Sequence, residues 1–131
     1  MRDNFSEEVK KKLCDRVGSK CSNPCCMVET KGPAGNQNVT NTGVASHITA
    51  ASIGGPRYDE SLTPEQRKSF SNGIWLCAKC AKMIDDDPET YSVELLNKWK
   101  SDAEYKQKLK IEGRELKKDN DNNDIRILLN Q

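Results

Sequence analysis

Two short cysteine clusters are the residues of this chain best suited to metal chemistry. Cys21, Cys25 and Cys26 form the first cluster, and the C-x-x-C pair Cys77 and Cys80 forms the second. Thiolates a few residues apart on a tight turn can reach one tetrahedral ion, and two such turns complete a four-sulfur zinc site. Spacing alone does not choose between the adjacent Cys25 and Cys26. We expect a structural zinc ion that joins two distant turns of the chain.

The only histidine of the chain, His47, lies between these clusters. A neutral imidazole is the side chain best suited to act as a general base at neutral pH. Because the chain has no second histidine, no other imidazole can take this role. Two alternatives stay open: His47 is an ordinary core histidine, or it replaces one cysteine in a mixed zinc site.

The composition favours a small domain that needs help from a metal. The chain has 131 residues, of which 34% are hydrophobic and 31% charged, and so thin a core is commonly supplemented by metals or disulfides. Neither a secretory signal nor a stretch long enough to span a membrane is visible. Six cysteines without a signal predict a reducing, cytoplasmic location, where C-x-x-C pairs bind metal. The net charge of +1 neither favours nor excludes nucleic acid.

Hydrophobic periodicity and turn residues predict an alternation of helices and short strands. Ser6 and Thr63 are expected N-caps, while Cys14 and Trp99 are expected to be buried in the core. In chain order we expect a helix over 6–17, an extended segment over 27–30, a loop over 31–43, a strand over 44–48, a short helix after residue 63, a strand over 74–76, a helix over 78–84 and a long helix over 92–110.

The last residues differ from the rest in composition. Residues 117–124 are polar and rich in asparagine, which is typical of a linker, and residues 125–129 are apolar. We therefore expect a first domain over 1–112, and over 113–131 a linker with the start of a further, missing domain. The alternative is that the apolar segment folds back onto the core.

The order strand, histidine, loop, asparagine, strand, C-x-x-C, helix resembles that of the HNH, or ββα-metal, endonucleases. Matching motifs at matching spacing make the resemblance specific to one subfamily, and it covers roughly residues 8–105. They occupy residues 43–51, 54–59, 72–77, 84–85 and 95–100. The resemblance implies an α+β fold, a small zinc-stapled treble-clef or ββα-metal (HNH) domain with flanking helices. In that subfamily the nuclease is often the N-terminal part of a bacterial anti-phage effector, joined to a downstream sensing domain.

The resemblance also implies which cysteines bind zinc. It leaves Cys25 spare, and the implied ligands are Cys21, Cys26, Cys77 and Cys80.

By the same resemblance His47 is the general base and Asn72 pins the segment that carries it. Asp85 corresponds to the metal-binding position on the helix, and a hard carboxylate suits Mg²⁺ or Mn²⁺. The other readings are a turn residue at Asn72 and a solvated helix terminus at Asp85. An acidic residue at a helix C-terminus opposes the helix dipole, which hints at another purpose.

Two positions depart from the usual HNH pattern. The residue before the base is often a metal ligand and is Ser46 here, and the residue after the second C-x-x-C is usually histidine and is Ala81 here. The catalytic ion would then rely on Asp85, with the Ser46 hydroxyl and Asp87 as further candidates, and on water and DNA phosphate. Such a site is expected to bind metal weakly without substrate.

The sequence therefore predicts a metal-dependent endonuclease that hydrolyses DNA phosphodiester bonds with little sequence preference. Arg57, Lys79 and Lys82 are candidate phosphate contacts, although each is more often an ordinary surface charge. The expected partners are DNA, a fused or associated sensing domain and other copies of the chain on activation, but not a membrane. The alternative function is an inactive treble-clef zinc module that binds nucleic acid or protein.

Overall fold

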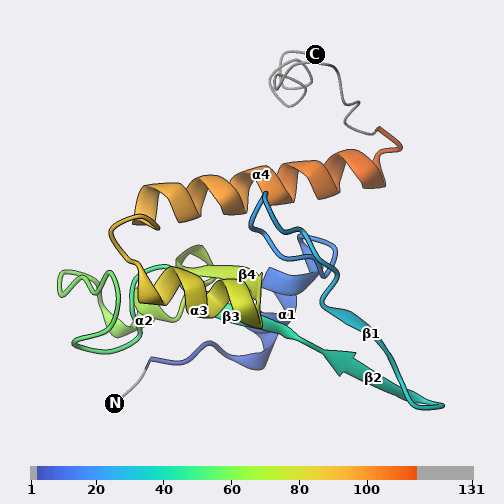
Figure 1. Ribbon diagram of the computed structural model, residues 1–131. Helices are drawn as coiled ribbons and strands as arrows, with labels where there is room; N and C mark the ends of the chain where they lie inside the picture. The colour runs from blue at the N-terminus through green and yellow to red at the C-terminus, as the bar shows by residue number, and fades with distance from the viewer. Residues whose placement is uncertain (1–2, 115–131) are drawn as a thin grey trace.

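The computed structural model describes residues 3–114, which form a small α+β domain with two antiparallel hairpins (Figure 1). The helices are α1 (Glu7–Asp15), α2 (Pro64–Arg67), the 3₁₀ turn η1 (Phe70–Asn72), α3 (Ala78–Asp86) and α4 (Val93–Ile111). The strands are β1 (Lys31–Ala34), β2 (Asn38–Asn41), β3 (Gly43–His47) and β4 (Gly73–Cys77).

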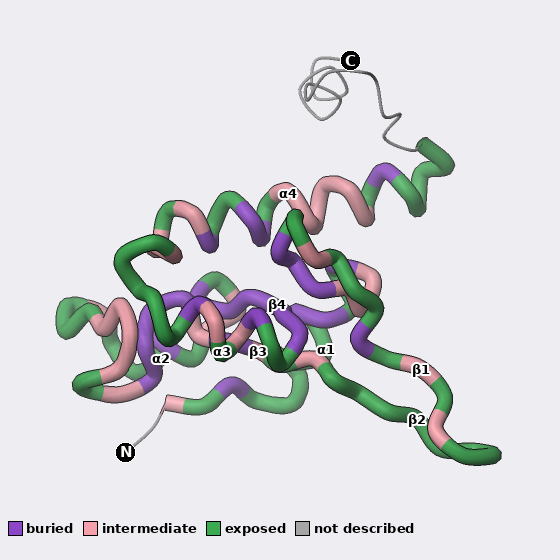
Figure 2. Tube along the Cα trace, in the orientation of Figure 1, coloured by how far each residue is buried: buried purple, intermediate pink, exposed green. Residues whose placement is uncertain are grey.

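The β3–β4 hairpin is the centre of the domain. Its antiparallel register runs from Gly43 opposite Cys77 to His47 opposite Gly73. Because side chains alternate across a strand, β4 serves two hydrophobic clusters. Ile74 and the other apolar residues on its side pack with α3 and α4, whereas Trp75 packs with α1. Figure 2 shows β4 as a buried band between these helices.

Local capping explains where the helices begin. Ser6 and Ser92 accept hydrogen bonds from backbone N–H groups in the first turns of α1 and α4. Thr63 and Gln66 form a complete capping box at α2. These starts agree with the sequence-based prediction. Cys14 and Trp99 are buried, which is also as predicted.

The loop predicted over 31–43 is wrong. β1 and β2 pair from Lys31 opposite Asn41 to Ala34 opposite Asn38, and Figure 1 shows this hairpin projecting from the body of the domain. Its residues are exposed or half-buried, so no alternation of apolar and polar residues marks the strands. Ahead of the hairpin, residues 27–30 contribute a single bridge, from Glu29 to Lys20, rather than a full strand.

The predicted linker and apolar segment over 115–131 lie outside the described residues. In the described part of the chain, no helix combines the length and the apolar character that crossing a bilayer requires.

Candidate functional site

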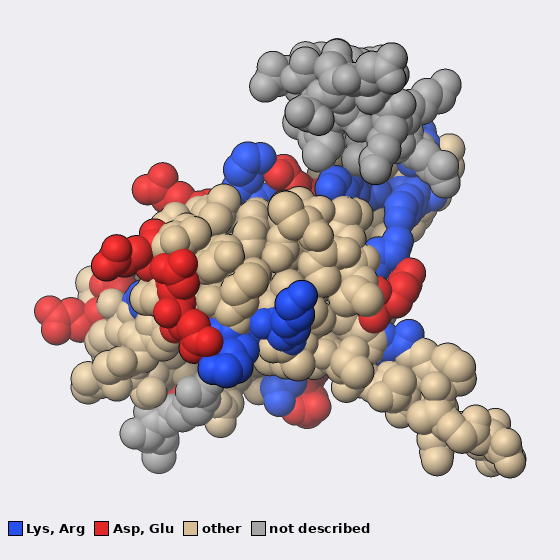
Figure 3. Space-filling model, viewed as in Figure 1, with Lys and Arg blue, Asp and Glu red and all other residues tan. Residues whose placement is uncertain are grey.

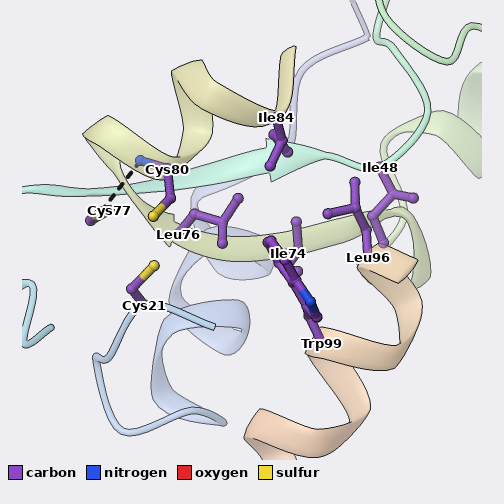
Figure 4. Close-up of a cluster of buried hydrophobic side chains, with 9 residues drawn as sticks. All are labelled: Cys21, Ile48, Ile74, Leu76, Cys77, Cys80, Ile84, Leu96 and Trp99. Carbon is purple, nitrogen blue, oxygen red and sulfur yellow. Dashed lines mark hydrogen bonds between the residues drawn. The ribbon is translucent and has the colours of Figure 1, made fainter. Parts of the chain in front are cut away.

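The four cysteines implied by the resemblance converge in space. Their Sγ atoms all lie within 4.8 Å of one another, and the Cys26 and Cys77 sulfurs are 3.9 Å apart. Bonds of about 2.3 Å to a tetrahedral zinc ion would place pairs of sulfurs about 3.8 Å apart, so this donor set fits structural zinc. Cys25 is exposed and outside the cluster, which resolves the choice that spacing left open. Figure 4 shows Cys21 facing Cys77 and Cys80 at one end of the apolar core.

Secondary structure places the cysteines around this point. Cys77 is both the last residue of β4 and the N-cap of α3, and its sulfur accepts a hydrogen bond from the Cys80 amide at 3.4 Å. The first turn is held against β4 because the Ser22 amide donates to the Trp75 carbonyl at 2.9 Å. Strand and helix thus fix one pair of sulfurs, and a backbone hydrogen bond brings the other pair to it.

The protein environment treats these thiols differently. Burial raises the pKa of Cys21 and of Cys80 above the ordinary value. At Cys77 burial also acts to raise the pKa, but hydrogen bonds from the Cys80 amide and the neighbouring thiols outweigh it, and the pKa is lowered. The Asn23 side-chain amide donates to the Cys80 sulfur at 3.4 Å. A cation bound here would replace the thiol protons, so affinity is expected to fall as the pH falls.

His47 is the last residue of β3, and the N-terminal segment covers its ring. The imidazole Nε2 lies 2.8 Å from the Asp3 carbonyl oxygen. The Phe5 ring stacks on it, with centroids 3.9 Å apart and planes 11° from parallel. This histidine is therefore not in the zinc cluster, and the predicted alternative of a mixed zinc site does not fit the structure.

Asn72 is buried and makes four hydrogen bonds. Its Oδ1 accepts from the Thr49 amide at 3.0 Å and from the Thr49 hydroxyl at 2.8 Å. Its Nδ2 donates to the carbonyls of Thr49 and Arg67, at 3.0 and 2.8 Å. The side chain thus fixes the two residues that follow His47, which is more than a turn residue needs.

Asp85 lies near the end of α3, where its carboxylate meets Arg57. Arg57 donates from Nη2 to Asp85 Oδ1 at 2.9 Å, from Nη1 to the Ile84 carbonyl at 2.9 Å and from Nε to the Ile48 carbonyl at 2.6 Å. The Arg57 side chain is only 4% exposed, and that of Asp85 is 51% exposed. The predicted phosphate contact at Arg57 is therefore replaced by a structural link between the segment after His47 and α3.

The two further candidate ligands differ in environment. The Ser46 hydroxyl is buried and has no hydrogen-bond partner among the described residues. Asp87 is exposed at the C-cap of α3 and accepts a hydrogen bond from the Thr90 amide at 3.3 Å. Within residues 3–114, the four-cysteine cluster is the only group of three or more Cys, His, Asp or Glu ligand atoms close enough to share an ion.

Lys79 and Lys82 are exposed on α3. Lys82 pairs with Asp86 one turn along the helix, at 3.0 Å, and the described residues offer Lys79 no partner. Both side chains are therefore accessible to an anionic ligand. In Figure 3 basic side chains lie near the middle of the visible face, with acidic ones gathered to their left.

Sequence reasoning missed three contacts of this site. The Asn23 amide beside the zinc cluster could have been suspected, since asparagine in a C-S-N-P-C turn often bonds to nearby groups. The contacts of Asp3 and Phe5 with His47 join residues more than forty positions apart, and nothing in the local sequence signals them.

Comparisons with known proteins supply no relative: no protein-family model matches the chain, and no curated protein matches it.

Proposed function

We propose that this protein is a metal-dependent endonuclease that hydrolyses DNA phosphodiester bonds. One observation carries the proposal: the Arg57 guanidinium joins the residue after His47 to Asp85, two candidate catalytic positions far apart in sequence. Asn72 fixes the same segment from the other side. The order β3, β4, α3 is that of the ββα-metal unit to which the sequence bears a resemblance.

In this proposal a zinc ion at the four cysteines is structural. It would join the first cysteine turn to the end of β4 and the start of α3, the helix that carries Asp85. Zinc with four thiolates has no open coordination position, so it would take no part in the reaction. The chemistry is assigned to a different part of α3 and to the end of β3.

Hydrolysis of a phosphodiester requires a base for water and a cation near the phosphate. His47 is assigned the first role, and its ring is already fixed on one side by Phe5. Asp85 would hold a Mg²⁺ or Mn²⁺ ion, with Asp87 and the unpartnered Ser46 hydroxyl as further ligands. When bound, this ion would offset the charge that builds on the phosphate. Lys79 and Lys82 would contact the DNA backbone.

The biological setting belongs to the same proposal. The resemblance suggests the nuclease module of an anti-phage defence effector, working with a sensing domain and activated when copies of the chain assemble. The balanced net charge of +1 agrees with a module that does not bind DNA tightly by itself.

The proposal is tested by incubating the protein with plasmid DNA in Mg²⁺, Mn²⁺ or EDTA. We expect cleavage with a divalent ion, no cleavage in EDTA, and a rate reduced at least about 100-fold in His47→Ala. The zinc content and the thermal unfolding midpoint of His47→Ala should stay near wild type. Equal cleavage by wild type and His47→Ala would contradict the assignment of the base.

The second candidate is a zinc module that binds nucleic acid or protein without cleaving it. Two observations favour it: Asp85 already pairs with Arg57, and the described residues hold no second three-ligand metal cluster. Alternation along β3 also directs Ser46 and His47 to opposite faces of the strand. DNA binding without cleavage in any metal would support this second candidate.

A further inference from the structure

We propose that residues 3–5 form a positioning segment for the His47 imidazole, which fixes the ring and decides which of its nitrogens carries the proton. The inference rests on the proposed function, in which His47 is the general base, and it adds residues to that site. These residues precede the stretch, roughly 8–105, that carries the resemblance to HNH endonucleases.

The Asp3 carbonyl sets the tautomer. A carbonyl oxygen can only accept a hydrogen bond, so the Nε2 atom that lies 2.8 Å from it must carry the hydrogen. In a neutral ring the lone pair is then on Nδ1. Nδ1 is therefore the atom that would take a proton from water in the proposed reaction.

Phe5 fixes the plane of the ring. The two rings stack at 3.9 Å, and Phe5 is buried in the hydrophobic cluster around α1. The position opposite His47 in the β3–β4 register is Gly73, and a Cβ there would lie 3.1 Å from Phe5 Cζ and 2.5 Å from Leu13 Cδ1. The glycine thus leaves the space in which Phe5 lies against the imidazole.

The segment is tied to the loop that follows His47. The Asp3 amide donates to the Ala51 carbonyl at 3.1 Å, and Arg67 Nη1 donates to the Asp3 carboxylate at 3.4 Å. The Arg67 carbonyl in turn accepts a hydrogen bond from Asn72. The positioning segment and Asn72 therefore hold the histidine and its loop as one unit. A ring held in one orientation and one tautomer needs no reorganisation before it accepts a proton.

The first test uses NMR on the complete chain, because a single histidine gives a single set of imidazole signals. At about pH 8.5, some two units above the ordinary histidine pKa, we expect Nε2 to be protonated, with a proton that exchanges slowly with water. Stacking should shift the ring protons upfield relative to Phe5→Leu. In Asp3→Pro, which removes the N–H donor to Ala51, the slow exchange should be lost. A wild-type ring protonated at Nδ1, or ring shifts unchanged in Phe5→Leu, would overturn the proposal.

The second test measures cleavage by folded variants with wild-type zinc content. Phe5→Leu and Asp3→Pro should lower kcat about tenfold or more and leave KM within about twofold, since the segment does not touch DNA. Phe5→Tyr, which preserves the stack, should restore kcat. The matched control is Asn4→Ala, since Asn4 is exposed between the two contacts, and it should behave as wild type. Unchanged kcat in both Phe5→Leu and Asp3→Pro would overturn the positioning role. If the wild type does not cleave, the proposed function fails, and the NMR result still decides whether the segment fixes the ring.

Discussion

Arg57 is the side chain through which the segment after β3 meets the end of α3. Its backbone has a left-handed φ of 57°, which costs a non-glycine residue roughly 1 kcal/mol or more. All three of its donor positions bind acceptors of this chain, two of them backbone carbonyls. Lysine has the same charge but cannot present a planar fork, so charge and geometry can be separated at this position.

We expect Arg57→Lys to lower the free energy of unfolding by about 1–3 kcal/mol, because it leaves buried carbonyls without donors. Asp85→Asn should cost less than about 1 kcal/mol, since the Asp85 carboxylate is half exposed and its ion pair is screened. Urea unfolding followed by circular dichroism measures both. Arg16→Lys is the control, because Arg16 pairs with Glu104 at the surface, and it should stay within about 1 kcal/mol of wild type. Equal costs for Arg57→Lys and Asp85→Asn would show that the ion pair, not the carbonyl contacts, is the main contribution.

Residue types and spacing were enough to predict the cysteine site but not the environment of the charged residues. Cysteines two or more positions apart have few uses in a reducing compartment, so the pattern specified the chemistry. The choice of Cys26 over Cys25 needed the resemblance, and geometry then confirmed it. Arg57 was expected to contact phosphate because nothing local shows that its acceptors lie 9 and 27 residues away in sequence.

At the scale of secondary-structure elements, local signals predicted the helices and missed one hairpin. The caps at α1, α2 and α4 are side-chain contacts within three residues, so the sequence contains them in full. β1 and β2 are stabilised by pairing with each other and bury little, so their polar, glycine- and proline-containing sequence is indistinguishable from a loop. Turn composition is then the only signal, and it is ambiguous.

Lys100 connects α4 to η1 and makes stability depend on pH. Burial lowers its pKa from 10.5 to about 8, and its ammonium donates to the Phe70 carbonyl at 2.6 Å. Below about pH 8 both states hold the proton, and the cost of burying the charge is fully present. Between about 8 and 10.5 the unfolded chain binds more protons than the folded one, so this group's contribution to stability rises with pH.

We therefore expect the free energy of unfolding of wild type, relative to Lys100→Met, to increase from pH 8 to pH 10.5 by on the order of 1 kcal/mol. Urea unfolding of both proteins across this range measures the difference, and groups common to both cancel. Lys98→Met provides the control, because Lys98 is an exposed lysine on the same helix and pairs with Asp102. A difference that is flat with pH, or that falls, would contradict the assigned pKa shift.

At the scale of the whole molecule, the fold consists of a two-stranded sheet with an apolar cluster on each face. The cluster on the α3 and α4 side contains three of the four clustered cysteines, so the metal site and the core are continuous (Figure 4). Only 34% of the residues are hydrophobic, and the projecting hairpin adds none to either core. Removing the ion would leave a group of buried thiols at the junction of the first turn, β4 and α3.

We expect one zinc ion per chain, and we expect its removal to unfold the domain. Zinc binding to four thiolates contributes roughly 10–16 kcal/mol, which equals or exceeds the roughly 5–15 kcal/mol by which domains are stable. Cys26→Ser should therefore lose zinc and its cooperative thermal transition, whereas the adjacent Cys25→Ser should keep both, since Cys25 is exposed and outside the cluster. Elemental analysis and calorimetry of the two variants, with and without a strong chelator, make the comparison. If Cys26→Ser kept its zinc and its unfolding transition, the ion would be held elsewhere, and the core packing on both faces of β4 would have to be sufficient to stabilise the fold.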